Sequence, residues 1–212
     1  MKKNYLIETM ESKRILNALK QINKIQKFIY VFGAAGTGKT TLIDRVRELD
    51  INSVVLAPTG IAALNVHGQT IHSFFELDWS PTPKIKTNLN SALIENLELL
   101  IIDEISMVNA SLMDAIDQSL RKNRKRNEPF GGVSLMLVGD IFQLEPVVVG
   151  ETKKFFNEKY GSPFYFDSFS IRNIDPEVYF LEHKFRQSND KSFGKFLDNI
   201  RLGDDLENTF KK

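Results

Sequence analysis

The sequence contains no cysteine, and it is poor in the other side chains that commonly bind metals. Without a thiol, the chain cannot carry a disulfide, a cysteine nucleophile, a thiolate zinc site or an iron–sulfur cluster. Only three histidines occur, at positions 67, 72 and 183, which argues against a multi-histidine metal centre. Any chemistry must therefore rest on carboxylates, hydroxyls, amides and basic side chains.

Net charge and long apolar runs are also missing. The 28 Lys and Arg residues nearly balance the 27 Asp and Glu residues, so a nucleic-acid surface would have to be a local patch. No apolar run is long enough to cross a membrane, and the basic start Met1–Tyr5 is not followed by a signal-peptide core. We expect a cytoplasmic protein that does not contact a membrane.

The 212 residues, 42% of them hydrophobic, suit one domain of α/β type. Compact apolar runs predict strands at residues 28–32, 53–57, 99–102, 133–138 and 178–181. Helical spacing covers residues 9–27, 40–49 and 111–120. This alternation is typical of a mostly parallel sheet with helices on both faces. We expect residues 1–27 to form an N-terminal helical segment of the same domain as residues 28–212.

A glycine-rich segment after the first predicted strand fits the phosphate-binding pattern G-x-x-x-x-G-K-[ST]. Its glycines let the backbone wrap around phosphate oxygens at the start of a helix. Lys39 is predicted to reach the β- and γ-phosphates of a nucleotide, and Thr40 to bind magnesium. A glycine-rich turn without function is the alternative, which the flanking strand and helix disfavour. The predicted nucleotide-binding residues are Gly33, Ala34, Ala35, Gly36, Thr37, Gly38, Lys39, Thr40 and Thr41.

Polar residues follow two further strands, at the sheet edge where ligands bind in parallel sheets. Asp103 follows the third strand and is a candidate magnesium ligand. Glu104 is a candidate base that accepts a proton from an attacking water. Gln143 follows the fourth strand and is suited to contact both the γ-phosphate and that water. The alternatives are an acidic pair that merely ends a strand and a polar loop residue.

Taken in order, these segments and several others resemble superfamily 1 DNA helicases of the PIF and RecD-like kind. The resemblance implies an N-terminal RecA-like motor domain that uses ATP with magnesium and moves 5′ to 3′ on single-stranded DNA to unwind duplex. It also implies a second RecA-like domain, of which this chain shows no motif, so we expect little or no turnover from the chain alone. The matching segments are Gly33–Thr40, Ala57–Ala63, Thr70–Phe75, Ile101–Val108, Gly139–Leu144, Phe185–Gln187 and Ile200–Gly203.

The same resemblance assigns a DNA track and a further catalytic residue. The predicted DNA track consists of Pro58, Thr59, Gly60, His72, Ser73 and Phe74. Phe74, Phe75 or Trp79 is suited to stack on bases. Arg186 resembles the family arginine that approaches the γ-phosphate, so we expect it to be catalytic together with Glu104, Lys39 and Gln143. For three of these residues an alternative stays open: a structural histidine for His72, core packing for Phe74 and a surface ion pair for Arg186.

Three features fall outside this resemblance. Neither Gln21 nor Gln26 stands where these helicases carry an adenine-reading glutamine, and Glu145 replaces the first of two family prolines. The run from Arg121 to Arg126 holds five cations in six residues. It forms either a phosphate-contacting patch or the solvated end of a helix, where cations favour the helix dipole.

Three functions are compatible with these residues. The first is the ATP-hydrolysing motor domain of a DNA helicase. The second is a single-domain, ATP-dependent DNA-binding module that does not unwind duplex. The third is another P-loop enzyme such as a nucleotide kinase, which would need an arginine-rich lid and has no use for Glu104 or Gln143.

Overall fold

The computed structural model describes residues 9–87, 89 and 91–185. The strands are β1 (Phe28–Gly33), β2 (Ser53–Ala57), β3 (Gln69–Thr70), β4 (Leu99–Ile102), β5 (Ser134–Gly139) and β6 (Glu177–Leu181). The α-helices are α1 (Met10–Leu19), α2 (Lys39–Arg47), α3 (Gly60–Asn65), α4 (Ile71–Phe74), α5 (Ser91–Glu95), α6 (Ala110–Arg124) and α7 (Glu151–Tyr160). Short 3-10 turns are η1 (Ile105–Met107), η2 (Pro129–Gly132) and η3 (Tyr165–Asp167).

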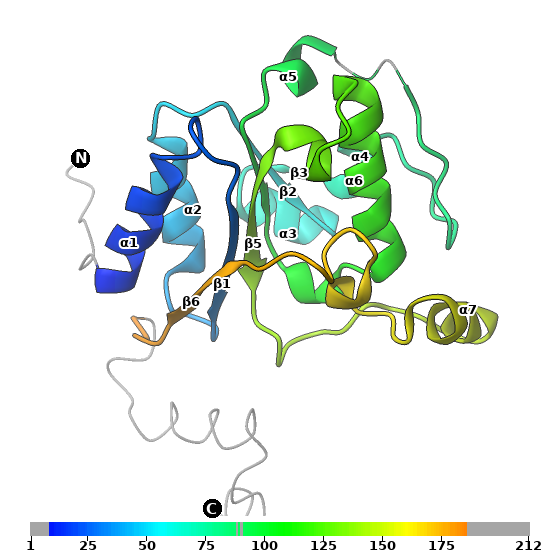
Figure 1. Cartoon of the computed structure of the whole chain (residues 1–212). Coiled ribbons are helices and arrows are strands. Elements are labelled where there is room, and N and C mark those ends of the chain that lie inside the picture. The colour runs from blue at the N-terminus through cyan, green and yellow to red at the C-terminus, as the bar shows by residue number, and fades with distance from the viewer. Residues whose placement is uncertain (1–8, 88, 90, 186–212) are drawn as a thin grey trace, which may run out of the picture.

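The six strands form one sheet in the order β3-β2-β4-β5-β1-β6, and every neighbouring pair is parallel. Helices α1 and α2 cover one face and α6 covers the other, as Figure 1 shows. Both faces of the central strands are therefore dry, which explains why their sequences are continuous apolar runs and not alternating ones. The predicted α/β class with a parallel sheet covered on both faces is confirmed.

The two cores follow from strand alternation, because successive side chains point to opposite faces. In β1, Ile29 and Val31 pack with Leu42 and Ile43 of α2, in the core that α1 also joins. Tyr30 lies on the opposite face, in the core that contains Ile116 of α6. The sheet is thus packed between two apolar layers, which hold the strands and the loops at their ends in place.

Three strand ends place the predicted catalytic segments at one edge of this sheet. β1 ends at Gly33, β4 ends one residue before Asp103, and β5 ends one residue before Asp140. Since β4 pairs with β5 and β5 pairs with β1, all in parallel, these carboxyl ends lie side by side. The fold therefore gathers the three segments as the sequence predicts.

The helix prediction for residues 9–27 is wrong in extent. α1 ends at Leu19, and the chain then turns through residues 20–25. Ile22 is still buried, but Ile25 is exposed, so the helical spacing of apolar residues outlasts the helix. Gln26 does not face a nucleotide, because its amide donates to the carbonyls of Pro129 (2.7 Å) and Val133 (2.8 Å).

The basic run is partly structural, which neither sequence interpretation anticipates. α6 extends through it to Arg124. Arg121 binds the Asp117 carboxylate at 2.8 Å, and the Arg124 guanidinium donates to the carbonyls of Ile94, Glu95, Leu97 and Gly131. Arg121 also donates to the Asn127 carbonyl just beyond the helix, so two of the five cations tie α6 to α5 and to neighbouring loops.

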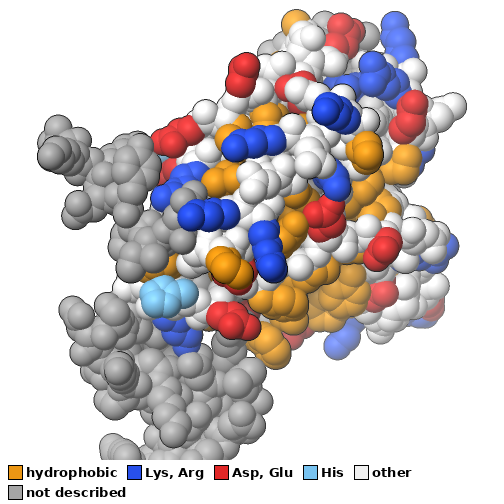
Figure 2. Space-filling model, turned by 60° about the vertical axis from the view of Figure 1, so that its left-hand side comes forward, with side chains coloured by type: hydrophobic (Ala, Val, Ile, Leu, Met, Phe, Trp, Pro, Cys, Tyr) orange, Lys and Arg blue, Asp and Glu red, His pale blue; other side chains and the backbone are white. Residues whose placement is uncertain are grey.

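The surface carries both signs of charge. Figure 2 shows Lys and Arg side chains interspersed with Asp and Glu over the upper part of one face, and hydrophobic side chains gathering lower on it. The edge strand β6 leaves Val178 and Phe180 exposed. Among the residues that the structure describes, no helix is long and apolar enough to cross a membrane.

Candidate active site

The loop between β1 and α2 is folded by glycines in the left-handed region. Gly36 has φ +80° and Gly38 has φ +91°, a conformation that costs other residues energy. The buried Thr37 hydroxyl donates to the Ala34 carbonyl at 2.9 Å, and the Phe185 backbone N–H donates to the Gly36 carbonyl at 2.9 Å. The loop is therefore preformed, with the positive end of α2 directed at the space in front of it.

Lys39, the first residue of α2, places its ammonium group over this loop. Its Nζ donates to the carbonyls of Gly33 (2.7 Å) and Ala34 (3.1 Å). Both carbonyls belong to the loop that is predicted to surround a phosphate. A bound phosphate oxygen could therefore replace them as the hydrogen-bond acceptor of the Lys39 ammonium group. The position fits the predicted role of Lys39.

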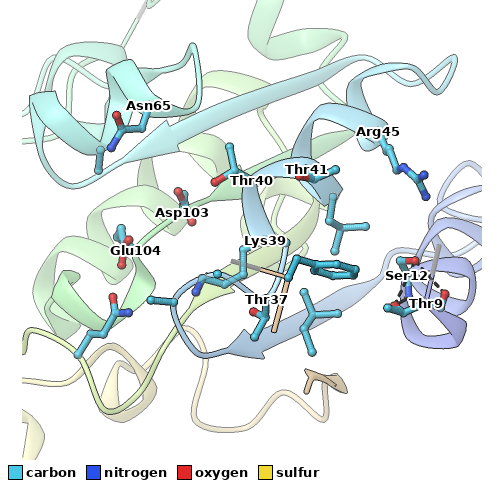
Figure 3. A pocket seen from close by; sticks show the side chains of 18 residues that line it. Thr9, Ser12, Thr37, Lys39, Thr40, Thr41, Arg45, Asn65, Asp103 and Glu104 are labelled. Carbon is cyan, nitrogen blue, oxygen red and sulfur yellow. Dashed lines mark hydrogen bonds between the residues drawn. The ribbon is translucent and has the colours of Figure 1, made fainter. Parts of the chain in front are cut away.

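A cavity of about 540 Å³ lies in front of this loop, and we call it the P-loop cavity. A cavity of this size suits a nucleotide. Figure 3 shows Asp103, Glu104 and Lys39 toward one end, with Thr9, Ser12 and Arg45 toward the other. The lining residues are Thr9, Ser12, Ala35, Gly36, Thr37, Gly38, Lys39, Thr40, Thr41, Leu42, Arg45, Ala62, Asn65, Asp103, Glu104, Gln143, Leu181 and Phe185.

Asp103 is a buried carboxylate, only 6% exposed. Burial raises the pKa of its carboxyl group, against the lowering effects of the Glu104 backbone N–H and of Lys39. Its Oδ1 is buried and has no hydrogen-bond partner among the described residues. Such an oxygen is costly unless something pairs with it, and hard divalent cations prefer oxygen ligands. With the Thr40 hydroxyl in the same cavity, the pair fits a magnesium site.

Glu104 is held in an unusual backbone conformation, with φ 51° and ψ 46°. A left-handed residue with a Cβ is strained by about 1–3 kcal/mol, and such strain concentrates at functional sites. Burial raises the pKa of the Glu104 carboxyl, as do the charges of Asp103 and Asp140, while Lys39 lowers it. A carboxyl with a raised pKa is a better proton acceptor than an ordinary one.

The end of β5 braces this turn. A Cβ at Gly139 would lie 2.9 Å from Ile105 Cγ2 and 3.1 Å from Ile105 N, so only glycine permits the contact. The buried Asp140 accepts from the Phe142 backbone N–H at 3.1 Å, and the Gln143 N–H donates to the Asp140 carbonyl at 3.0 Å. These bonds hold Gln143 at the cavity wall.

The cavity thus brings together the predicted phosphate, magnesium and catalytic residues, except for three. Gly33 and Ala34 contribute their carbonyls to Lys39 and do not line the cavity. Arg186, together with Gln187 and Ile200–Gly203, lies outside the described residues, so its predicted role is not tested by this structure.

The sequence analysis did not predict several of the residues that line the P-loop cavity. Thr9 and Ser12 form the N-terminal cap of α1, with the Ser12 N–H donating to Thr9 Oγ1 at 3.2 Å. A cap motif predicts a helix start but not what the start faces. Asn65 ends α3, and Arg45 lies in α2 without any motif spacing. Only the folded chain brings these residues to the cavity.

The predicted DNA track is assembled from two neighbouring strand ends. β2 pairs with β3 so that Ala57 lies opposite Thr70. Pro58–Gly60 and the α4 residues therefore follow the same edge of the sheet. Thr59 and Thr70 cap α3 and α4 through their hydroxyls, Ser73 is exposed, and Phe74 is half-buried against the core.

Comparison with known proteins gives matches over nearly the whole chain. A family model described as PIF1-like helicase matches residues 8–209. The ATP-dependent DNA helicase PIF1 of Saccharomyces cerevisiae (strain YJM789) is 36% identical over 200 residues, which is 87% of this chain and 22% of the relative. The human PIF1 helicase is 34% identical over 186 residues, which is 82% of this chain and 27% of the relative.

Solved structures match as well. A crystal structure of Pif1 helicase from Bacteroides in complex with ADP-AlF3 and ssDNA has a TM-score of 0.89 at 34% identity, covering 96% of this chain and 48% of that one. A structure of two coordinating Pif1 helicases at forked dsDNA has a TM-score of 0.84 at 36% identity, covering 92% of this chain and 48% of that one. The chain thus spans about half of these solved chains and under a third of the two curated relatives.

Proposed function

The chain belongs to the PIF1-like helicase family, and from that premise we propose that it is the N-terminal, ATP-hydrolysing motor domain of a DNA helicase. The single observation that carries the proposal is the P-loop cavity, in which Lys39, Thr40, Asp103, Glu104 and Gln143 meet. A P-loop alone binds a nucleotide. A buried acidic residue and a strained, proton-accepting glutamate beside it supply what hydrolysis needs in addition.

Each side chain has a chemical role in this proposal. Lys39 exchanges its loop carbonyls for phosphate oxygens, and the N–H groups at the start of α2 donate to the same phosphates. Glu104 accepts a proton from the attacking water, and Gln143 orients that water against the γ-phosphate. Thr40 and Asp103 would hold Mg²⁺, which neutralises phosphate charge when it is bound.

Single-stranded DNA is the proposed second partner, along the predicted DNA track. The match to a Bacteroides Pif1 crystallised with ADP-AlF3 and ssDNA supports this partner. Movement from 5′ to 3′ and unwinding of duplex are proposed on the resemblance to the family. Arg186 of this chain would approach the γ-phosphate, and a further arginine from a second RecA-like domain would complete the site from the other side. Cytoplasmic localisation stays a prediction of the sequence.

The test is ATP hydrolysis by the 212-residue chain with and without single-stranded DNA, with nucleotide affinity measured in parallel. Glu104→Gln should bind ATP normally and hydrolyse none, because the amide cannot accept the proton. Lys39→Ala should lose ATP affinity. Unchanged nucleotide affinity in Lys39→Ala, or undiminished turnover in Glu104→Gln, would refute the assigned site.

The same measurement separates the motor domain from a DNA-binding module without unwinding activity. Turnover that rises with single-stranded DNA supports the motor domain. If the chain binds nucleotide without turnover, a PIF1-family second RecA-like domain is joined to it and the assay is repeated. Turnover that is still absent then favours the binding module.

A further inference from the structure

The segment after α4 leaves one large aromatic side chain in water. Trp79 is 78% exposed, although Phe75 and Leu77 just before it are buried in the core. It is also the only tryptophan in the chain. Phe75 and Leu77 already hold this segment against the core. The exposure of the indole therefore indicates a role for Trp79 other than core packing.

The indole is not a loose side chain, because it lies flat on His72. The two ring centroids are 3.7 Å apart and the rings are 16° from parallel. The Leu77 N–H donates to the His72 carbonyl at 2.9 Å, which returns the chain over the histidine. One face of the indole is therefore covered by the imidazole, and the opposite face is left to solvent.

The loop that carries Trp79 is tied on both sides. The Asp78 carboxylate accepts from the Ser80 N–H at 3.0 Å and from the Lys84 N–H at 3.4 Å. Glu76 and Lys86 form an ion pair at 2.8 Å across the base of the loop. A flat aromatic surface held in this way loses little conformational entropy when a second ring stacks on it.

The position of the stacked pair connects it with the predicted DNA track. His72 is itself a track residue, and α4 follows β3 at the same sheet edge as Pro58–Gly60. Backbone and hydroxyl groups of such a track hold phosphates without contacting bases. The bases of such a strand can be bound by stacking on an aromatic ring, and this contact does not depend on the base sequence.

We propose that the solvent-facing side of Trp79, backed by His72, is a stacking platform for one nucleobase of single-stranded DNA. This inference rests on the proposed function and selects among the three aromatic residues that the sequence suggests. Phe75 is fully buried, and Phe74 packs edge-on against it with ring centroids 4.8 Å apart. Trp79 is the one of the three that presents an open ring face.

The stack is chemically suited to a base and not to a phosphate. Burial lowers the pKa of His72, so the imidazole beneath the indole is neutral near pH 7, while the nearby Asp78 charge opposes that shift. The neutral ring pair offers a phosphate no positive charge to pair with. The contact is therefore expected to add affinity without adding to the salt dependence of binding.

Because Trp79 is the only tryptophan, the tryptophan emission of the unmodified chain, excited at a wavelength that tyrosine does not absorb, reports on this residue alone. The chain is titrated with an oligothymidylate and with an abasic oligodeoxynucleotide of equal length. Binding of both is followed independently by the anisotropy of a label on the DNA. We expect the oligothymidylate to quench the tryptophan emission in step with binding, and the abasic strand to bind without quenching it.

Two variants extend the test. Trp79→Ala should weaken oligothymidylate binding roughly fivefold to hundredfold, the range for one lost stacking contact, with an unchanged salt slope. Trp79→Phe keeps a ring face and should retain most of the affinity. ATP affinity should stay at its wild-type value in both variants, since Trp79 does not line the P-loop cavity.

The outcomes separate this inference from the function on which it rests. If the anisotropy shows DNA binding but the tryptophan emission stays constant, or if Trp79→Ala binds as wild type does, the platform is refuted and the DNA track is kept. If neither oligonucleotide binds, the proposed DNA partner fails, and the platform fails with it.

Discussion

Thr59 and Asn65 mark the two ends of one short helix: the Thr59 hydroxyl caps the start of α3, and Asn65 is its last residue. Thr59 belongs to the predicted DNA track, whereas Asn65 lines the P-loop cavity. At 1.5 Å per residue the two sites are only about 9 Å apart along α3. A helix this short, in contact with both sites, is suited to transmit the state of one to the other.

Replacing Asn65 with Ala should therefore weaken the coupling between nucleotide and DNA. We expect the effect of single-stranded DNA on ATP affinity to fall about threefold to tenfold, with affinity for ATP alone nearly unchanged. Leu64→Ala, on the exposed side of the same helix, is the matched control. Equal coupling in both variants and wild type would show that α3 does not connect the sites.

The left-handed backbone of Glu104 leads to a prediction on stability. Glycine has no Cβ and tolerates φ 51°, so Glu104→Gly should have a free energy of unfolding about 1 kcal/mol higher than Glu104→Ala. Both variants lose the carboxylate and should be inactive. Urea denaturation of the pair gives the difference directly.

The control pair for this experiment lies in an ordinary helix. At the exposed Lys122 of α6, glycine should be less stable than alanine by about 1 kcal/mol, the usual helical order. The order should thus reverse between the two positions. If Gly is also the less stable residue at position 104, the backbone there is not strained.

Five of the six strands could be predicted to within about a residue, because each is an apolar run that ends at a glycine, a proline or an acidic residue. The two-residue strand β3 (Gln69–Thr70) is too short to show any periodicity, and it forms only because β2 offers a neighbouring edge. α1 stops earlier than its apolar spacing, because the chain must turn to enter β1. Local sequence does not contain that tertiary constraint.

The residues of the candidate site were likewise only partly predictable from the sequence. Its phosphate, magnesium and catalytic candidates other than Arg186 belong to motifs that follow strands, so topology and spacing predict that they meet at one edge of the sheet. Thr9, Ser12 and Asn65 come from helix ends with no motif of their own, and only packing brings them to the cavity. The stack of Trp79 on His72 likewise depends on a loop path that composition cannot predict.

Arg124 should prove to be a structural residue within the basic run. Its guanidinium satisfies the carbonyls of residues 94, 95, 97 and 131, which would lose a charged donor in Arg124→Ala. We expect the free energy of unfolding to fall by about 3 kcal/mol, since several partly buried acceptors become unpaired at once. Lys122→Ala, two residues away and exposed, should change it by less than about 0.5 kcal/mol.

His72 should make the stability of the fold depend on pH below neutrality. Burial lowers the pKa of its imidazole in the folded chain, and the opposing effect of Asp78 is smaller. As the pH falls through about 6.5, the unfolded chain takes up this proton before the folded chain does. The unfolded state then binds more protons, so the free energy of unfolding decreases with falling pH until the folded-state pKa is reached.

The variant His72→Phe removes the titrating group but keeps a ring under Trp79. Urea unfolding of both proteins at pH 7.5 and 5.0, followed by Trp79 emission, isolates the contribution of this histidine from that of every other titrating group. Wild type should lose more stability between the two pH values than His72→Phe does. An equal loss would mean that the imidazole charges as readily in the fold as in water, and that the stack does not hold it in the neutral form.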